Sequence, residues 1–267
     1  MAESGKVSEA RLPTGGGVSD GVRVAVDNTV RTVTLARPAK RNALNPAMLI
    51  GLHEAFGSEP SDDERVAVIC AEGPVFCAGL DLTERTGGTS ISIESALHAI
   101  GTYPLPVVAA VGGDAIAGGA ELALHCDLIV ASSEARFGMS LAQIGLAPPW
   151  ALAVRLLDAA GPAVAREILM LGDPVVAARL GELGIIARVA SPQAFEQTVD
   201  SVISRLAQNA PHSLRAIKAT LGRAMEFRSG MAHDDVDELI GQAARSEDAR
   251  EGMQARLQKR SPRFMGR

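Results

Sequence analysis

One carboxylate lies within a run of small and apolar residues, directly behind a pair of glycines. Residues 115–124 read AIAGGAELAL, and Glu121 is the ionisable residue of this stretch. Two interpretations are open. In the first, Glu121 is a solvated residue of a short helix, and Gly118 and Gly119 only permit a tight strand-to-helix turn. In the second, the glycine turn exposes backbone N–H groups that attract an anionic oxygen, and Glu121 exchanges a proton in the same pocket.

A second turn offers backbone donors of the same kind. The stretch EGPVFCAGLDL at residues 72–82 follows the apolar segment VAVICA at 66–71 and has small residues around Gly79. Two such turns after two neighbouring strands can direct two N–H groups at one oxygen atom. In sites of this type, one donor contributes roughly 3–4 kcal/mol of transition-state stabilisation. The pattern therefore indicates a reaction that passes through an enolate.

The elements that must position these turns are predicted from hydrophobic periodicity. Residues 22–36 alternate polar and apolar side chains across Asp27 and Asn28, which predicts a β-hairpin. Asn45 and Pro46 suit the cap and the first position of the following helix. Buried strands separated by helices favour an α/β fold with parallel strands. The strands are predicted at 66–71, 106–112 and 127–131, and the helices near 91–101 and 118–125.

The chain is predicted to have three parts. Residues 1–20 are rich in glycine, serine and charge, as in a disordered arm. Residues 21–205 form the α/β core, and residues 206–267 form a helical region. Successive amphipathic helices begin near residue 160, and one strand, IIARVA, interrupts them. Two apolar stretches, SVISRL and VDELIGQAA, predict that other copies of the chain cover the helical tail, in a trimer or hexamer.

Composition disfavours several classes of protein. The net charge is −5 and aromatic residues make up 3%, which argues against nucleic-acid binding. The three cysteines lack metal-ligand spacing and indicate reduced thiols in a cytoplasmic protein. No apolar run reaches the roughly 18 residues of a membrane span, and the first residues do not resemble a signal peptide. We expect neither a metal nor a redox cofactor, because the chain has no ligand cluster and no G-x-G-x-x-G motif.

Six stretches, in this order and at these separations, resemble the enoyl-CoA hydratase/isomerase (crotonase) superfamily from residue 22 onward. They read RPAKRNALNPAML, FCAGLDL, AAVGGDAIAGGAELALHCDLIVAS, ARFGMSLAQIGLAP, LGELGIIARV and EGMQARLQKRSPRFMGR. The resemblance implies an α/β fold, a crotonase-like spiral of ββα units followed by a C-terminal helical oligomerisation region. It also implies a homotrimer or a dimer of trimers, with a coenzyme A thioester as substrate.

The resemblance also assigns a site. The oxyanion-hole amides belong to Leu80 and Gly118, and Glu121 is the general acid/base. A carboxylate near apolar side chains tends toward a raised pKa, which suits proton transfer near neutrality. The backbone expected to line the path of coenzyme A lies around Ala43, Ala78, Asp81 and Leu82. Asp81 is also expected to brace the loop that carries Leu80.

The chain departs from the pattern at the second catalytic carboxylate of the family's hydratases. That position is Leu141, which cannot transfer protons. Pro149 and Trp150 stand where small residues are common and indicate an altered acyl pocket. Hydration, double-bond isomerisation, hydrolysis and decarboxylation therefore stay open, as does a catalytically impaired protein that only binds acyl-CoA. Because Glu121 is retained, the prediction is an enoyl-CoA hydratase.

Other groups are weaker candidates for the missing function. Gln143 could orient a water, whereas His125, four residues after Glu121, is more often a packing histidine. Asp114 offers a carboxylate near the pocket or holds a turn, and the turn is favoured. In this family, C-terminal residues of a neighbouring subunit often approach the phosphates of coenzyme A. Lys259 and Phe264 are candidates for that contact.

Overall fold

The computed structural model describes residues 18–84 and 91–267. A disordered arm is predicted for residues 1–20, and residues 1–17 of it lie outside the described residues. For residues 18 and 19 the prediction is wrong, because Val18–Ser19 form the short strand β1, which pairs antiparallel with β2. Hydrogen bonding to a neighbouring strand orders these residues despite their polar sequence context.

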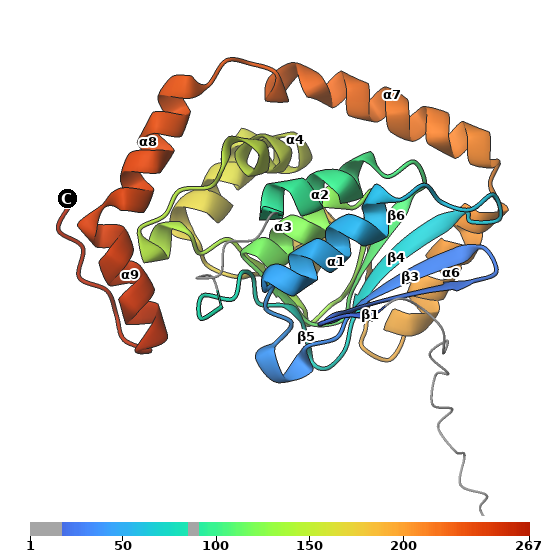
Figure 1. The fold of residues 1–267 in the computed structure, drawn as a ribbon, viewed down its shortest axis with the longest axis horizontal. Helices are drawn as coiled ribbons and strands as arrows, with labels where there is room; N and C mark the ends of the chain where they lie inside the picture. Colours follow the sequence, from blue (N-terminus) through green and yellow to red (C-terminus); the bar gives the residue numbers. More distant parts are fainter. Residues whose placement is uncertain (1–17, 85–90) are drawn as a thin grey trace, which may run out of the picture.

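Two sheets form the body of the protein (Figure 1). The larger sheet has the strand order β1-β2-β3-β4-β6-β8-β11, and every pair from β3 onward is parallel. Its strands after β1 are β2 (Val22–Asp27), β3 (Val30–Leu35), β4 (Val66–Ala71), β6 (Val107–Val111), β8 (Leu128–Ser132) and β11 (Arg188–Ala190). The smaller sheet has the order β10-β9-β7-β5. Its strands are β5 (Val75–Cys77), β7 (Asp114–Ile116), β9 (Arg136–Gly138) and β10 (Val175–Val176).

The two sheets arise from one repeated unit. The order β4-β5-α2, β6-β7-α3 and β8-β9-α4 places the first strand of each unit in the larger sheet and the second in the smaller sheet. The helices are α2 (Ile93–Thr102), α3 (Gly118–His125) and α4 (Trp150–Arg166). The chain is therefore a spiral of ββα units, as expected. The second strand of each unit has only three residues, which is too short for periodicity to predict.

Local chemistry explains the elements that the sequence does predict. Asn28 takes a positive φ of 51° in the turn of the β2–β3 hairpin, a conformation that asparagine tolerates. Helix α1 (Pro46–Gly57) begins where expected, because the Asn45 side chain accepts a hydrogen bond from the Met48 amide at 3.0 Å. The hairpin and the capped helix are both confirmed.

The larger sheet is buried on both faces. On one face, β4, β6 and β8 pack beneath α1, α2 and α3 (Figure 1). On the other, Val68, Val108 and Val130 pack against α6 (Phe195–Gln208). The stretch SVISRL lies on α6, and its apolar side chains, Val202, Ile203 and Leu206, pack on this sheet. The expectation that another subunit covers SVISRL is therefore wrong, since the sheet of the same chain covers it.

The C-terminal helices run around the outside of the body (Figure 1). They are α7 (Pro211–Ser229), α8 (Asp234–Arg245) and α9 (Glu247–Leu257). The stretch VDELIGQAA falls on α8, which has no buried residue, and Leu239 is 63% exposed. On α7, Ile217, Leu221 and Met225 are also exposed. No helix of residues 18–84 and 91–267 is long and apolar enough to cross a membrane.

The remaining helices partly correct the sequence-based boundaries. The helix predicted to open at Gly161 is the second half of α4, which already begins at Trp150. Gly161 has a φ of 72° and marks a kink before Pro162. Within the region where successive helices are predicted from near residue 160, residues 174–184 form β10 and the short helix α5 (Ala177–Glu182). Short helical turns lie at Pro38–Lys40, Ala142–Ile144 and Glu167–Leu171.

A buried ion pair joins the hairpin to the helical layer. Arg31 donates to both carboxylate oxygens of Glu64, at 2.7 and 3.1 Å, and to the Ala55 carbonyl at 2.8 Å. Burial raises the pKa of Glu64, but hydrogen bonds from Arg31 and Ser61 outweigh it and leave that pKa below its usual value. The side chains of Arg31 and Glu64 are only 10% and 2% exposed. Removing either partner therefore leaves the other as a buried, unpaired charge.

Replacing Arg31 with methionine is expected to lower the free energy of unfolding by about 3–5 kcal/mol, because Glu64 is left buried and unpaired. Urea denaturation near neutral pH measures the effect. Arg179→Met is the matched control, since its partner Glu167 is 37% exposed and the pair is worth at most about 1 kcal/mol. Equal losses of unfolding free energy in the two variants would contradict the conclusion that the Arg31–Glu64 pair stabilises the core.

Candidate active site

The two glycine turns lie against each other. An ideal Cβ built on Gly79 would lie 3.2 Å from the Gly118 amide nitrogen, and one built on Gly118 would lie 3.6 Å from the Leu80 amide nitrogen. Within the described chain, neither the Leu80 amide nor the Gly118 amide has a hydrogen-bond acceptor. Leu80 follows β5, and Gly118 is the first residue of α3. The structure thus brings together the two amides that the sequence predicts as a donor pair.

Backbone strain sets the direction of the second turn. Ala117, the residue before α3, has φ 49° and ψ −117°, a conformation that side chains other than glycine rarely adopt. Its amide donates to the Gly138 carbonyl at 2.6 Å, and its carbonyl accepts from the Glu121 amide at 3.0 Å. Strain of this type costs about 1–3 kcal/mol and persists where the surroundings hold it. Here it starts α3 with the Gly118 amide beside Leu80.

Glu121 is buried, so the interpretation as a solvated surface residue is wrong. The residue is 7% exposed, one turn into α3. Burial, with a smaller contribution from the charge of Glu94, raises the pKa of Glu121 to about 7, and Arg155 partly opposes this shift. Within the described residues its carboxylate has no hydrogen-bond partner. A carboxyl group in this state is able both to take up and to release a proton near neutral pH.

The raised pKa of Glu121 predicts a pH-dependent stability. Because the folded pKa of about 7 exceeds the unfolded value of 4.5, the contribution of Glu121 is fully present below the unfolded pKa and is lost as pH rises through the folded pKa. Glu121→Gln is therefore expected to be more stable than the wild type by roughly 3 kcal/mol at about pH 8, and by less than about 1 kcal/mol at about pH 5. Urea denaturation at both pH values tests this, and a difference independent of pH would contradict it.

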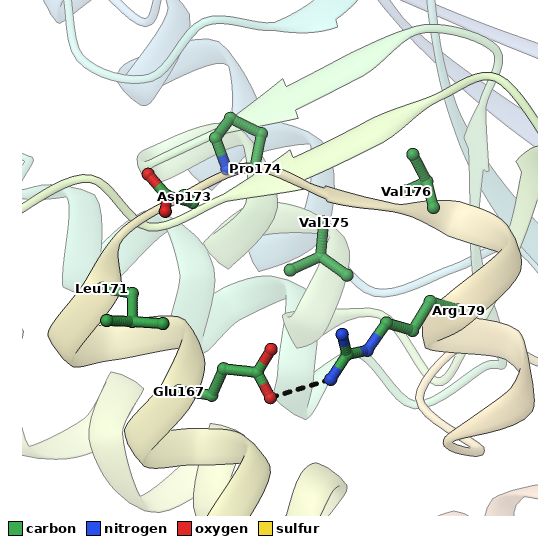
Figure 2. A pocket seen from close by; sticks show the side chains of 7 residues that line it. All are labelled: Glu167, Leu171, Asp173, Pro174, Val175, Val176 and Arg179. Carbon is green, nitrogen blue, oxygen red and sulfur yellow. Dashed lines mark hydrogen bonds and ion pairs between the residues drawn. The ribbon is translucent and has the colours of Figure 1, made fainter.

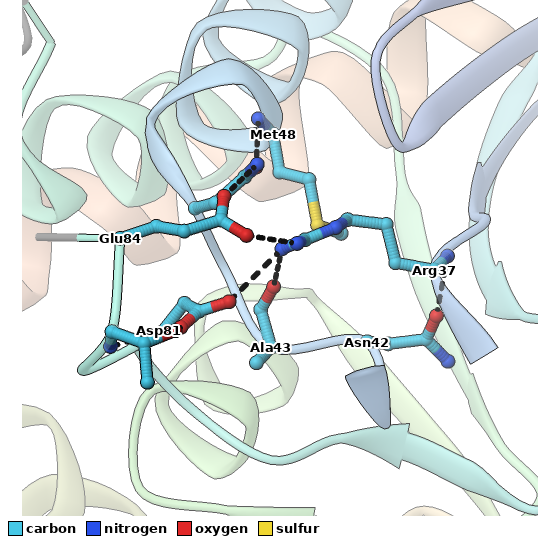
Figure 3. Close-up of polar contacts among 8 residues, drawn as sticks. Arg37, Asn42, Ala43, Met48, Asp81 and Glu84 are labelled. Carbon is cyan, nitrogen blue, oxygen red and sulfur yellow. Dashed lines mark hydrogen bonds and ion pairs between the residues drawn. The ribbon is translucent and has the colours of Figure 1, made fainter. Parts of the chain in front are cut away.

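Arg37 connects the segment before α1 to the loop that follows Leu80 (Figure 3). Its guanidinium donates to the Ala43 carbonyl at 2.9 Å, to Asp81 at 3.3 Å and to Glu84 at 2.7 Å. Asp81 also accepts hydrogen bonds from the Thr83 amide and hydroxyl. Burial raises the pKa of Asp81, but these hydrogen bonds and Arg37 lower it below its usual value. Asp81 therefore stays ionised and braces the loop.

Main-chain hydrogen bonds align the same two segments. The Ala78 amide donates to the Arg41 carbonyl, the Leu44 amide to the Gly79 carbonyl, and the Asp81 amide to the Leu44 carbonyl, at 2.8–3.0 Å. The residues predicted to line the coenzyme A path thus lie on two adjacent strips of backbone. These residues are Ala43, Ala78, Asp81 and Leu82. Arg37 is a part of this arrangement that the sequence analysis does not single out, although it lies in the stretch RPAKRNALNPAML.

The groups considered as substitutes for the second carboxylate form structural contacts with other residues. Gln143 donates to the Leu171 carbonyl at 2.9 Å and to Asp173 at 3.0 Å. Leu171 and Asp173 line a cavity of about 290 Å³ that the Glu167–Arg179 ion pair spans (Figure 2). None of the residues that line this cavity is a candidate site residue. Leu141 packs against the main core.

His125 and Asp114 also have structural partners. His125 is 8% exposed and donates its Nδ1 proton to the Glu121 carbonyl at 2.8 Å. Burial lowers the pKa of His125 to about 4, so it stays neutral at physiological pH. Asp114 binds the Arg136 guanidinium at 2.6 Å, which holds the pKa of that carboxyl below its usual range. Asp114 thus joins β7 to β9 rather than holding a turn, and Glu121 is a buried carboxylate in the first turn of α3, which begins at Gly118.

The C-terminal candidates lie apart from Glu121 in the single chain. Phe264 lines a cavity of about 550 Å³ with residues of α8, and none of the catalytic candidates lines it. Lys259 follows α9 and is exposed. Within residues 18–84 and 91–267, no group of three or more His, Cys, Asp or Glu side chains is arranged to hold a metal ion.

The ββα spiral, with two facing backbone amides and a buried carboxylate in the first turn of α3, fits the crotonase superfamily, and the comparison of sequences shows that family. Residues 25–267 match the Enoyl-CoA hydratase/isomerase family, and the chain belongs to this family. It is 35% identical to a putative enoyl-CoA hydratase of Thermus thermophilus, over 88% of this chain and 97% of that protein.

Solved structures share the whole fold. An enoyl-CoA hydratase from Mycobacterium avium subsp. paratuberculosis superimposes with a TM-score of 0.82 at 27% identity, covering 93% of this chain and 100% of the other. A methylmalonyl-CoA decarboxylase superimposes with a TM-score of 0.86 at 25% identity, covering 94% of this chain and 100% of the other. The same fold thus carries more than one reaction of coenzyme A thioesters, and the side chains around the amide pair must decide between them.

Proposed function

We propose that this protein binds a coenzyme A thioester and hydrates the double bond of a 2-enoyl-CoA. The thioester oxygen accepts hydrogen bonds from the Leu80 and Gly118 amides, and Glu121 is the general acid/base. The observation that carries the proposal is the position of Glu121, a buried carboxylate with a pKa of about 7, three residues after an amide that lacks an acceptor in the described chain. No metal or redox cofactor is required by this scheme.

In the proposed reaction, Glu121 supplies both proton transfers. The ionised carboxylate takes a proton from water, and the oxygen of that water bonds to C3 of the enoyl group. The electron pair of the double bond moves to the thioester as an enolate, whose oxygen the two amides stabilise. Protonated Glu121 then delivers its proton to C2, which completes a 3-hydroxyacyl-CoA. The ionised form of the free enzyme is active, so kcat/KM is expected to fall below about pH 7.

Leu141 favours one alternative, a protein that binds acyl-CoA without turning it over. A leucine at that position removes a proton-transfer group, and Gln143 does not replace it. The family membership also leaves isomerisation, hydrolysis and decarboxylation as candidate reactions. Among these, hydration is favoured because Glu121 can make both transfers.

A panel of enoyl-CoA substrates separates these functions. Loss of the conjugated-thioester absorbance with formation of a 3-hydroxyacyl-CoA supports hydration. Binding of coenzyme A esters without turnover of any member supports the alternative. Because Pro149 and Trp150 are predicted to alter the acyl pocket, the panel includes branched and dicarboxylic acyl groups as well as linear ones.

Exposed apolar side chains on α7 and α8 predict that the active form is a trimer or hexamer. Leu221, Met225 and Leu239 are 41–63% exposed in the single chain. An apolar surface of this kind is normally buried by association. Light scattering at micromolar concentration is expected to give three or six times the mass of one chain, and a monomeric mass would contradict the prediction.

A further inference from the structure

Helices α2 and α3 lie side by side (Figure 1), and side-chain contacts near both of their ends show that they run in the same direction. At the beginning of the two helices, the Ile93 Cδ1 atom lies 3.0 Å from an ideal Cβ on Gly118. At their ends, an ideal Cβ on Gly101 lies 4.0 Å from the His125 Cδ2 atom. The first turns of α2 and α3 are therefore neighbours. The first turn of α3 carries Glu121.

Glu94 occupies the matching position on α2. It follows Ile93 directly and shares a helical stripe with His98 and Gly101, at spacings of four and seven residues. Gly101 faces His125, and Glu121 precedes His125 by one turn on α3. The stripe of α2 that begins with Glu94 thus runs along the stripe of α3 that begins with Glu121. In agreement with this placement, the charge of Glu94 raises the pKa of Glu121, in addition to the larger increase caused by burial.

The side chain of Glu94 is exposed, and no described residue forms a hydrogen bond or ion pair with it. The preceding Ser92 caps α2 by accepting from the Ser95 amide, so Glu94 is not needed as the cap. A thioester oxygen between the Leu80 and Gly118 amides would lie against Ile93, the neighbour of Glu94.

We propose that Glu94 is a second carboxylate of this pocket and accepts a hydrogen bond from the water that Glu121 deprotonates. This inference rests on the proposed hydration. In this step Glu94 only accepts the hydrogen bond of the water, while Glu121 takes one proton of the water and returns it to C2. Glu94 thereby provides the water orientation that a leucine at position 141 cannot. Two carboxylates in different environments, here one buried and one exposed, are a recurrent arrangement for acid–base catalysis.

Few other charged groups face Glu121 from the elements packed on α3. Helix α4 contributes Arg155, which lowers the pKa of Glu121. Strand β5 contributes Cys77, whose pKa is raised to about 12 by burial, so it is uncharged. Asp114 of β7 is paired with Arg136, and His125 on α3 is neutral. Glu94 is therefore the acidic group of α2 whose replacement changes the surroundings of Glu121.

Three variants test the proposal with the best enoyl-CoA of the panel. Glu94→Ala removes the acceptor and the charge, and its hydration kcat is expected to fall by about 10²-fold. Glu94→Gln keeps an acceptor oxygen without the charge, and a smaller loss is expected. Glu54→Gln, which removes an exposed carboxylate of α1, is the control and should leave kcat unchanged. Equal kcat values at the pH optimum for wild type, Glu94→Ala and Glu94→Gln would overturn the proposal, even if the pH profile shifts.

A second measurement separates water orientation from a structural role. Exchange of the C2 protons of the saturated acyl-CoA analogue into D2O needs Glu121 but no bound nucleophilic water. Glu94→Ala is therefore expected to retain this exchange while losing hydration, and a parallel loss of both would overturn the proposal. If the wild type neither hydrates nor exchanges, the proposed function fails and this inference with it. If the wild type does both and Glu94→Ala hydrates normally, only the inference fails.

Discussion

Replacing Gly118 with valine is expected to reduce turnover by about 10²–10³-fold, the loss that follows removal of one oxyanion donor. The first atom of the new side chain would lie 3.6 Å from the Leu80 amide nitrogen, in the space where the thioester oxygen must sit. The φ angle of Gly118 is one that valine adopts without strain, since Gly118 is not among the positive-φ residues. Circular dichroism and thermal denaturation should show a folded protein, and steady-state kinetics measure the loss.

Two further variants show whether the effect comes from the blocked oxygen site. The Cβ atom introduced at position 118 would also lie 3.0 Å from the Ile93 Cδ1 atom, a contact close enough to displace α2. Ile93→Ala in the Gly118→Val background relieves that contact but leaves the amide pair obstructed, so turnover should stay low. Recovery of turnover in the double variant, or unchanged turnover in folded Gly118→Val, would show that the carbonyl does not bind there. Gly119 is unsuitable for this test, because a Cβ there would lie 2.2 Å from the Cys77 carbonyl oxygen.

The large elements of the fold were predictable because their signals are local. Asn45 and Pro46 mark the start of α1 within the sequence itself, and the strands β4, β6 and β8 are continuous apolar runs. The smaller sheet was not predictable, because three-residue strands have no measurable period. Helix α8 lies in the predicted helical region 206–267, and its apolar residues are exposed in the single chain.

The site was predictable only in part. The glycine turns around Gly79 and Gly118 are visible in the sequence, as is the carboxylate that follows the second turn. Burial of Glu121 is a property of the packed helices and cannot be deduced from a run of ten residues. The positions of Arg37 and Glu94 depend on contacts with segments that lie more than twenty residues away along the chain. Neither residue has a spacing motif that would single it out.

Replacing Glu121 with glutamine is expected to lower turnover by about 10²–10⁴-fold, the contribution of a positioned acid–base group. Glutamine keeps the size of the side chain and part of its hydrogen bonding but cannot titrate. Affinity for acyl-CoA should change little, because the thioester oxygen is held by the Leu80 and Gly118 amides. Steady-state kinetics and equilibrium binding of a saturated acyl-CoA measure the two quantities. Thermal stability at about pH 8 provides the folding control, since the variant is expected to be the more stable protein there.

Leu141→Glu is the complementary change. It introduces a carboxylate at the position that the family's hydratases use, and it should raise hydration of a simple enoyl-CoA if the acyl pocket admits that substrate. In the Glu121→Gln background the same change should restore little, because one ionised carboxylate at position 141 does not replace the proton transfer to C2. Full turnover in Glu121→Gln alone would mean that another group moves the proton. Of the described acidic groups around α3, Asp114 is held by Arg136 and Glu94 is exposed, so Glu94 would then carry the proton itself.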